Sequence, residues 1–360
     1  MVIIFLEAWR MRVNHSIHTI ALRRKIRLEE VSLWRNVFYD LSERYNTGVY
    51  RKSNDEREFY MYAPQGVIIN LRAAKNCGYI GVTINLNSLF YREPQRVVLF
   101  YLDKYNLKTF DRNLRELFRD AQMGAPEEFE FMRVDFSANA KTEDPLAYIA
   151  LARKSGVPNG FQETYPRFDN RKRRKAINYA YSYDLTHNRE EYAISLYSKA
   201  DQLKDDRNAE LRDIQDAQGL LRFEAKYGAS KLKAHFEMTD LHYSPEKLCV
   251  FLTASSAVLR KAMCGCVPEG TYYSLPAARK LLGRAGKSVQ RERLLQWIED
   301  TARSNSASKA RRKFYESLSA SQYAALMRYQ QESGINPVTI GRNWKRQSLP
   351  GLQEVFELET

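Results

Sequence analysis

Cysteine is scarce in this chain, which has only four in 360 residues: Cys77, Cys249, Cys264 and Cys266. So few thiols exclude a disulfide scaffold in a protein of this length and fit a reducing cytosol. Cys264 and Cys266 form a CxC pair without a second pair downstream, so the spacing of a structural zinc site is missing. We therefore do not expect zinc to be bound by these thiols.

Long apolar runs and nucleotide-binding loops are also lacking. No run reaches the roughly 18 residues that a membrane span needs, and the opening stretch MVIIFLEAWRMR makes a poor signal peptide. Gly286-Lys287-Ser288 resembles the end of a phosphate-binding loop, but Leu281 stands where that loop needs its first glycine. We therefore expect no membrane partner, and we reject a nucleoside triphosphate site of this type.

Acidic residues are too few to balance the basic ones, because 43 Asp and Glu face 57 Lys and Arg and leave a net charge of +14. A surplus of this size indicates a polyanionic partner such as nucleic acid. Basic residues gather in a loop-like segment inside the chain and near its C-terminus, at Arg171, Lys172, Arg173, Arg174, Lys175, Arg311, Arg312 and Lys313. Short charge runs are by default solvated surfaces, so solvation and contact with DNA phosphates both stay open for them.

Six segments between Gln122 and Gly228 follow the order strand, helix, strand, strand, helix, strand. In sequence they are EFEFMRVDFSANA, DPLAYIALARKSG, KAINYAYSYDL, EYAISLYSKA, DQLKDDRNAELRDIQDAQ and GLLRFEAKY. This order predicts an α+β protein with a ferredoxin-like βαββαβ antiparallel sheet as its nuclease core, strand order 4-1-3-2, and helices on one face. We expect an N-terminal α/β region over 1–120 packed on the core sheet, the catalytic core over 121–240, and a helical C-terminal domain over 241–360.

Three ionisable residues fall on adjacent strands in that order: Asp135 on the first, Tyr197 on the third and Glu224 on the fourth. Alternation along each strand predicts one open polar face, which carries Arg133, Asp135, Ser195, Tyr197, Lys199, Arg222, Glu224 and Lys226. Carboxylate oxygens favour magnesium or manganese, and a cation held there polarises a scissile phosphate. The alternative to a metal site is a solvent-exposed polar sheet face on which these residues form a ladder of ion pairs.

The cations on this face have two expected uses. The ordinary pKa of a tyrosine is near 10, so we expect Lys199 either to lower the pKa of Tyr197 or to bind the phosphate. Arg133, Arg222 and Lys226 are candidates for contact with the DNA backbone.

Three of these segments resemble the replication initiators of filamentous bacteriophages, the gene II protein type, including those of vibrio phages. FMRVDFSANAK resembles the family's Arg-Ile-Asp strand, and AISLYSKADQL resembles its hydrophobic-Tyr-x-Lys hairpin strand. GLLRFEAKYGASKLKAHF resembles its Leu-Val-Arg-Phe-Glu-Ala-Arg segment. The likeness covers residues 80–340 and is tight only over these three motifs.

The resemblance implies a DNA nicking-closing endonuclease that starts rolling-circle replication. It implies a site-specific nick at an origin, a covalent 5′-phosphotyrosine intermediate, a 3′-hydroxyl primer, and later closure of the displaced strand. The implied partners are origin DNA, single-stranded or supercoiled, with a host helicase and polymerase in the host bacterial cytoplasm. Two alternatives stay open: a non-enzymatic basic DNA-binding regulator, and a relaxase of a conjugative or transposable element.

The resemblance also assigns residues. It implies Tyr197 as nucleophile with Lys199 beside it, and its strand acids correspond to Asp135 and Glu224, which we expect to hold the metal. The family's glutamate five residues after the tyrosine is Gln202 here, so Asp201 becomes the candidate for a third ligand. Many rolling-circle nickases use a His-hydrophobic-His metal motif, which no histidine of this sequence forms, so the nickase interpretation requires a metal site built from carboxylates.

Overall fold

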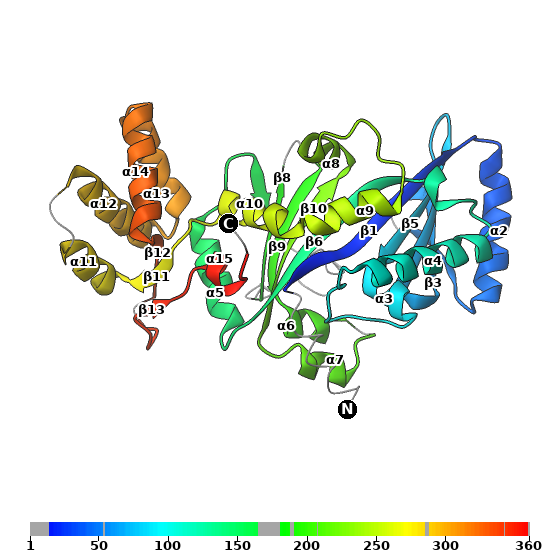
Figure 1. The fold of residues 1–360 in the computed structure, drawn as a ribbon, viewed down its shortest axis with the longest axis horizontal. Coiled ribbons are helices and arrows are strands. Elements are labelled where there is room, and N and C mark those ends of the chain that lie inside the picture. Colours follow the sequence, from blue (N-terminus) through cyan, green and yellow to red (C-terminus); the bar gives the residue numbers. More distant parts are fainter. Residues whose placement is uncertain are drawn as a thin grey trace. The chain divides into compact units, whose positions relative to one another are not determined.

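The computed structural model describes residues 14–52, 55–164, 181–187, 191–206, 208–284, 288–341 and 343–358. Internal contacts divide the chain into two compact units, each assembled from three stretches of sequence. Unit 1 consists of Met1–Ala138, Glu190–Tyr192 and Glu224–Ser256, and unit 2 consists of Asn139–Arg189, Ala193–Phe223 and Ala257–Thr360. Figure 1 shows the fold, with labels on those helices and strands for which there is room.

The larger sheet has ten strands in the order β2-β3-β4-β5-β1-β6-β10-β9-β8-β7. In chain order they are β1 (His15–Ile26), β2 (Val49–Lys52), β3 (Asp55–Ala63), β4 (Val67–Ala73), β5 (Gly78–Asn85), β6 (Glu130–Lys141), β7 (Phe161–Glu163), β8 (Ser182–His187), β9 (Tyr192–Ser198) and β10 (Leu220–Gly228). The pairs β1–β5, β1–β6, β4–β5 and β8–β9 are antiparallel. The predicted α+β class with a large antiparallel sheet is therefore confirmed.

The helices up to residue 266 follow the strands closely in sequence. They are α2 (Glu30–Arg44), α3 (Leu86–Tyr91), α4 (Lys104–Asp120), α5 (Pro145–Ser155), α6 (Lys199–Lys204), α7 (Leu211–Asp216), α8 (Ala229–Phe236), α9 (Pro245–Thr253) and α10 (Ser255–Cys266), with the 3₁₀ helices η1 (Pro64–Gly66) and η2 (Pro126–Glu128). None of the described helices is by itself long and apolar enough to cross a membrane; only the bent pair of α9 and α10 together reaches that length and composition.

Helix α4 illustrates how the local sequence sets these elements. The Asp103 carboxylate accepts a hydrogen bond from the Asn106 N–H at 2.7 Å and so caps the first turn. Phe110, Leu114 and Phe118 recur at helical spacing and are completely buried. The cap fixes where the helix begins, and the apolar stripe fixes which face turns to the core of unit 1.

The order of the core strands differs from the predicted 4-1-3-2. In the predicted numbering β6, β8, β9 and β10 are strands 1 to 4, and the observed order is 1-4-3-2. The reason is that a strand has two hydrogen-bonding edges, and the N-terminal strand β1 already pairs with one edge of β6. Only one edge of β6 is left for the core, so β10 stands between β6 and β9.

Strand alternation in β6 is interrupted by β-bulges. Between β1 and β6 the register shifts twice, which leaves His18 as the extra residue on β1 and Met132 as the extra residue on β6. As a result Phe131, and not Met132 as the alternation predicts, joins Val134 in the core with no exposed surface. Beyond the bulge Val134 and Phe136 are completely buried as predicted, but Asp135 and Ser137, which were expected on an open face, are buried as well.

Unit 2 contains a second sheet in the C-terminal part that was expected to be helical. Its strands are β11 (Thr271–Ser274), β12 (Ile335–Ile340) and β13 (Ser348–Leu349), in the order β12-β11-β13. The neighbouring helices are α11 (Leu275–Arg284), α12 (Val289–Ser304), α13 (Ala307–Ser317), α14 (Ala320–Ser333) and α15 (Leu352–Val355). Strand β12 is buried along its whole length, and a short buried run has no periodicity that distinguishes it from a helix.

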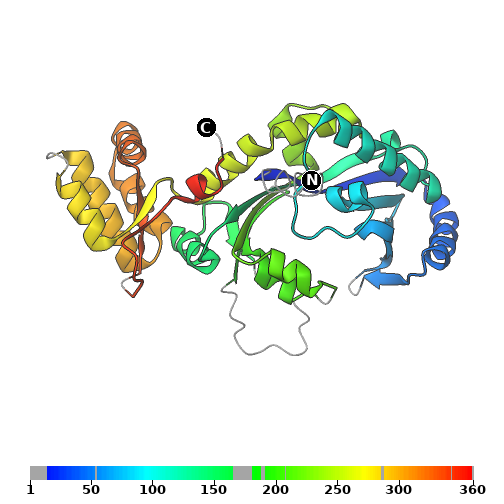
Figure 2. The same ribbon diagram turned by 60° about the horizontal axis from the view of Figure 1, so that its bottom comes forward.

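Helices α11 to α14, coloured yellow to orange in Figure 2, gather around a small core of their own. Trp297 lies at its centre with 1% of its surface exposed, among Leu294, Ile298 and Leu326. Its indole N–H donates to the Ala307 carbonyl at 3.1 Å, which ties α12 to the start of α13. The packing of these helices therefore depends strongly on one side chain.

Trp297→Ala is expected to lower the free energy of unfolding by about 3–5 kcal/mol, because it leaves a large cavity in this core. Urea denaturation followed by far-UV circular dichroism measures the change. Tyr315→Ala serves as the control, since its side chain on α13 is 69% exposed, and its effect should stay below about 1 kcal/mol. Equal effects of the two substitutions would contradict a central role for Trp297.

Candidate functional site

Two buried carboxylates lie in unit 1, Asp135 on β6 and Glu224 on β10. Only 5% and 6% of their surfaces are exposed. Each has a cation two residues away on its own strand, where side chains share a face. Arg133 Nε lies 2.9 Å from Asp135 Oδ1, and Lys226 Nζ lies 3.5 Å from Glu224 Oε2. The predicted alternation of these four residues holds, but the carboxylates are buried rather than exposed on an open face.

The two carboxylates share one electrostatic environment. Burial raises the pKa of Asp135 to about 6, the charges of Arg133 and Lys226 act to lower it, and the charge of Glu224 raises it further. Residues of β10 thus change the proton affinity of a side chain on β6. Asp135 is consequently protonated well below pH 6 and charged at pH 8.

One oxygen of this pair lacks a hydrogen-bond partner. Asp135 Oδ1 is buried without a hydrogen bond, and the Arg133 Nε beside it is likewise unsatisfied, so their 2.9 Å approach is an ion pair of poor alignment. Leaving a buried charged oxygen unsatisfied costs on the order of 1–3 kcal/mol. A third group that supplies a positive charge at Oδ1 would recover this energy.

These residues fit a hard divalent cation in part. Two carboxylates with an unsatisfied oxygen are a donor set that suits magnesium or manganese. Across the described ranges no group of three His, Cys, Asp or Glu side chains is placed to hold a metal. Asp135 and Glu224 would therefore be two protein ligands, and water and phosphate oxygens would complete the shell, as is usual for magnesium.

Tyr197 stands in unit 2, where β9 changes directly into α6. The strand ends at Ser198, whose side chain caps the helix by accepting the Asp201 N–H at 3.4 Å. Lys199, predicted as a strand residue on the open face, is instead the first residue of α6 and is 5% exposed. The strong N-cap explains the change, because a serine before a helical run ends the strand earlier than alternation suggests. Tyr197 itself is half-buried.

Lys199 remains close to Tyr197 in spite of this change. Its Nζ lies 6.0 Å from the centroid of the Tyr197 ring and donates to Gln202 Oε1 at 2.7 Å. Gln202, the residue that departs from the family's glutamate, therefore holds the lysine by a neutral oxygen. Position 202 therefore supplies no carboxylate to offset the charge of the lysine beside the tyrosine.

Asp201 takes part in local contacts of α6. It accepts hydrogen bonds from the Ser198 hydroxyl at 2.6 Å and from Lys204 Nζ at 2.7 Å. Burial acts to raise the pKa of Asp201, but the bonds from Lys204 and Ser198 outweigh it and leave the pKa below its usual value. Both carboxylate oxygens are thus used to start the helix, and Asp201 lies in unit 2, whereas Asp135 and Glu224 lie in unit 1.

The predicted DNA-binding cations on the strands fall into two groups. Arg133 and Lys226 expose 44% and 36% of their side chains and are ion-paired with the two carboxylates. Arg222 is completely buried, and its Nε donates to Asn139 Oδ1 at 2.7 Å. A surface contact between Arg222 and DNA does not fit this burial, because the central strand β10 is covered at that position.

Of the two predicted basic runs, the structure describes only the one near the C-terminus. Arg311, Arg312 and Lys313 are all exposed on α13, where Arg312 Nη2 lies 3.4 Å from Asn159 Oδ1 and Lys313 Nζ lies 3.8 Å from Asp300 Oδ2. The run Arg171, Lys172, Arg173, Arg174 and Lys175 lies outside the described residues. Exposed cations with few local partners are suited to phosphate contact.

Sequence reasoning missed the residues that β1 brings to Asp135. Thr19 is its partner across the β1–β6 ladder, and Thr19 Oγ1 lies 2.8 Å from His18 Nδ1. His18 Nε2 in turn lies 3.1 Å from Asn85 Nδ2. The alternation in HSIHTIALRR indicates a strand, but only the long-range pairing with β6 reveals which site that strand adjoins.

Asp135→Asn tests the raised pKa. Below about pH 4 the carboxyl is protonated in both the folded and the unfolded state, so it has no effect on stability. As the pH rises from about 4 to 6 the unfolded chain loses the proton first, and the wild type should lose on the order of 2–3 kcal/mol of stability. Asp135→Asn lacks this loss, so in metal-free buffer it should be more stable than the wild type at pH 8 and equal to it at pH 4.

Chemical denaturation at a series of pH values measures the difference. Asp216→Asn is the control, since that side chain is 61% exposed and its substitution should give a nearly constant difference. A difference in stability between Asp135→Asn and the wild type that is the same at pH 4 and pH 8 would show that the pKa of Asp135 is not raised in the folded state.

Comparisons with known proteins give little further guidance. No family model matches the sequence, and no curated protein matches it significantly. Among solved structures the chain is similar to the Rolling Circle Replication Initiator Protein from Geobacillus stearothermophilus, with a TM-score of 0.35 and 8% identity over 70% of this chain and 85% of that one. A TM-score of this size does not establish a common fold or a common activity.

Proposed function

We propose that this protein nicks and rejoins DNA to start rolling-circle replication, with Tyr197 as the nucleophile. The observation that carries the proposal is the buried pair of Asp135 and Glu224, which raise each other's energy and leave one oxygen unsatisfied. Burying two like charges together costs free energy, and an enzyme can tolerate that cost where the carboxylate pair binds a metal ion.

Asp135 and Glu224 would hold one magnesium or manganese ion. When bound, the ion would act as a Lewis acid that polarises the scissile phosphate and stabilises the charge that develops on it. Arg133 and Lys226, each ion-paired with one of the carboxylates, keep them charged and oriented. Their exposed portions are available for DNA phosphates on either side of the cleaved bond.

Tyr197 supplies the covalent step. Its phenolic oxygen attacks the phosphorus, forms a bond to the 5′-phosphate, and displaces the 3′-oxygen, which leaves as a hydroxyl after taking up a proton. The phenolic proton passes to solvent. The reverse reaction, attack of a 3′-hydroxyl on the phosphotyrosine, rejoins the strand and releases Tyr197. The free 3′-hydroxyl is the primer that a host polymerase would extend behind a host helicase.

Lys199 acts on the tyrosine rather than on the metal. Its buried ammonium lies over the Tyr197 ring and is held by Gln202. A positive charge in this position stabilises the phenolate relative to the phenol. Because the lysine is fixed by the first turn of α6, it needs no rearrangement when DNA binds.

Tyr197→Phe is expected to abolish both nicking and adduct formation, because no other group can take the place of the phenolic oxygen. Supercoiled origin plasmid with magnesium provides the nicking assay, and denaturing gel electrophoresis detects the covalent protein–DNA adduct. Tyr192→Phe on the same strand is the matched control and should keep both activities. An adduct that persists in Tyr197→Phe would remove Tyr197 from the mechanism.

Metal dependence should follow the titration of Asp135. Protonation of a ligand competes with metal binding, so the magnesium concentration needed for half-maximal nicking should rise steeply as the pH falls below about 6. Asp135→Asn and Glu224→Gln are each expected to reduce nicking at least about 100-fold. Asp201→Asn should reduce it much less, because its oxygens serve α6.

The proposed regulator and relaxase alternatives give different results in these assays. A non-enzymatic regulator would bind origin DNA but form no nick and no adduct with either magnesium or manganese. A relaxase would form the same adduct on a different DNA sequence, which nicking of plasmids that carry transfer origins would reveal.

A further inference from the structure

Unit 2 contains a cavity of about 810 Å³ that is separate from the residues discussed above. It is lined by α11 and α12, the end of β12, the turn after β12, and Lys154 of α5. Its volume lies within the range of pockets that bind small molecules, about 300–1,000 Å³. It is therefore large enough for one nucleotide.

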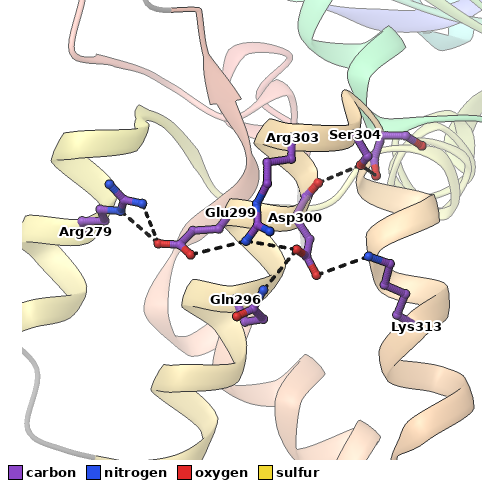
Figure 3. A network of polar contacts seen from close by, with 8 residues as sticks. Arg279, Gln296, Glu299, Asp300, Arg303, Ser304 and Lys313 are labelled. Atoms are coloured by element: carbon purple, nitrogen blue, oxygen red, sulfur yellow. Dashed lines mark hydrogen bonds and ion pairs between the residues drawn. The ribbon is translucent and has the colours of Figure 1, made fainter.

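The charges around this cavity are predominantly positive. The charged side chains of its wall are Lys154, Arg279, Arg303, Lys345, Arg346 and a single acid, Glu299. Figure 3 shows Glu299 between Arg279 and Arg303, and Arg279 Nη2 lies 2.7 Å from its carboxylate. One carboxylate therefore orients two guanidinium groups without neutralising the wall.

Two other cations of the wall, Lys154 and Arg346, differ in their partners. Arg346 pairs with Glu143 at 2.7 Å, but the Glu143 side chain is 86% exposed, so water screens that pair. Lys154 forms no ion pair with any acid in the part of the chain that the structure describes, and burial lowers its pKa. An anion in the cavity would stabilise the charged form of Lys154.

The cavity also has an aromatic wall and an unsatisfied polar group. Trp344 lines it from the turn after β12, with Lys154 Nζ 6.0 Å from the centroid of its indole ring. Thr301 of α12 lines it too, is 2% exposed, and has a buried hydroxyl without any hydrogen-bond partner. An unsatisfied hydroxyl at the wall of a cavity would gain a hydrogen bond from a polar group that reaches it there.

We propose that this cavity binds one nucleoside phosphate unit. Its base stacks on Trp344, its phosphate lies among Lys154, Arg279 and Arg346, and Thr301 bonds to a polar edge of the base or sugar. Planar stacking, several cations, and a solitary hydroxyl are the combination that nucleotides require. Inorganic phosphate would leave Trp344 and most of the volume unused, and an apolar molecule would remove water from five cations without replacing it.

The nucleotide can come from a single strand of DNA or from free nucleotide. We expect the DNA strand, and this choice of source rests on the proposed function. The cavity itself does not, because it shares none of its lining residues with the Tyr197 segment or the carboxylate pair.

The test measures binding in a background that cannot react. Full-length Tyr197→Phe protein in EDTA is titrated into a fluorescein-labelled oligothymidylate of twelve nucleotides, and fluorescence anisotropy gives the affinity. Trp344→Ala should weaken binding about tenfold or more, because one stacked base is lost. Thr301→Val, which keeps the shape of the side chain, should weaken it about threefold to tenfold. Neither substitution should change the salt dependence, whereas Arg346→Gln should reduce its slope by about 0.7.

Trp34→Ala is the matched control, because Trp34 of α2 also has a cation at its ring, Arg24 at 5.7 Å, and should leave the affinity unchanged. A second arm measures binding of thymidine monophosphate by calorimetry and its competition with the oligonucleotide. Sensitivity of the oligonucleotide alone to Trp344→Ala and Thr301→Val assigns the cavity to DNA. Sensitivity of thymidine monophosphate alone assigns it to free nucleotide.

Unchanged binding of both probes in both variants overturns the proposal. Circular dichroism melting of each variant confirms that it is folded, and Thr301→Val keeps the test decisive if Trp344→Ala is unstable. Because the binding assay does not require nicking, the proposed nucleotide site can be refuted without refuting the proposed nicking activity, and the reverse.

Discussion

The two edges of strand β6 set the arrangement on which the proposed chemistry depends. β1 pairs with one edge in an antiparallel ladder, and β10 is the neighbour on the other side. Since a strand has no third edge, β10 occupies the remaining edge of β6 as an interior strand of the sheet, and the charge of Glu224 on β10 acts on Asp135. Both carboxylates thus lie on interior strands of the sheet, and the raised pKa of Asp135 is a consequence of its burial.

This arrangement is difficult to explain as a stabilising device. The pairs Arg133–Asp135 and Lys226–Glu224 join a buried carboxylate to a partly exposed cation, and the cost of removing such a carboxylate from water can exceed what the ion pair contributes. Charging Asp135 in its buried position costs more than such pairs return, and a threonine or valine there would avoid the cost. Proteins commonly retain unfavourable groups where activity needs them, which favours a functional role over a ladder of ion pairs.

The sequence predicted the elements better than their partners. Alternation along β10 correctly related Glu224 to Lys226, because side-chain period is a local property. The strand order could not be predicted, because β1 is separated from β6 by more than a hundred residues and its pairing depends on long-range contacts. Two local features also interrupt the alternation. An extra residue forms the bulge at Met132, and the Ser198 cap starts a helix at Lys199. The period of two residues by itself predicts neither of them.

The candidate residues likewise divide into those that a local sequence motif identifies and those that only the folded chain brings together. Tyr197, Asp135 and Glu224 could be named from motifs, whereas Thr19 joins them only through a ladder register. Trp344 and Thr301 have no motif at all, since they meet at one cavity from a turn and from α12. Arg222 matched the motif, yet its place on a central strand turns it into a buried partner of Asn139.

Charge and stacking supply different parts of the proposed recognition of DNA. A net charge of +14 attracts any polyanion, and the affinity gained from it falls steeply with salt because bound counterions are released. It does not distinguish a single strand from a duplex, since both present phosphates. An aromatic wall such as Trp344 does distinguish them, because only an unpaired base offers its face. The proposed initiator would need this second kind of contact, since the strand to be cut would have to be held unpaired during the proposed attack by Tyr197.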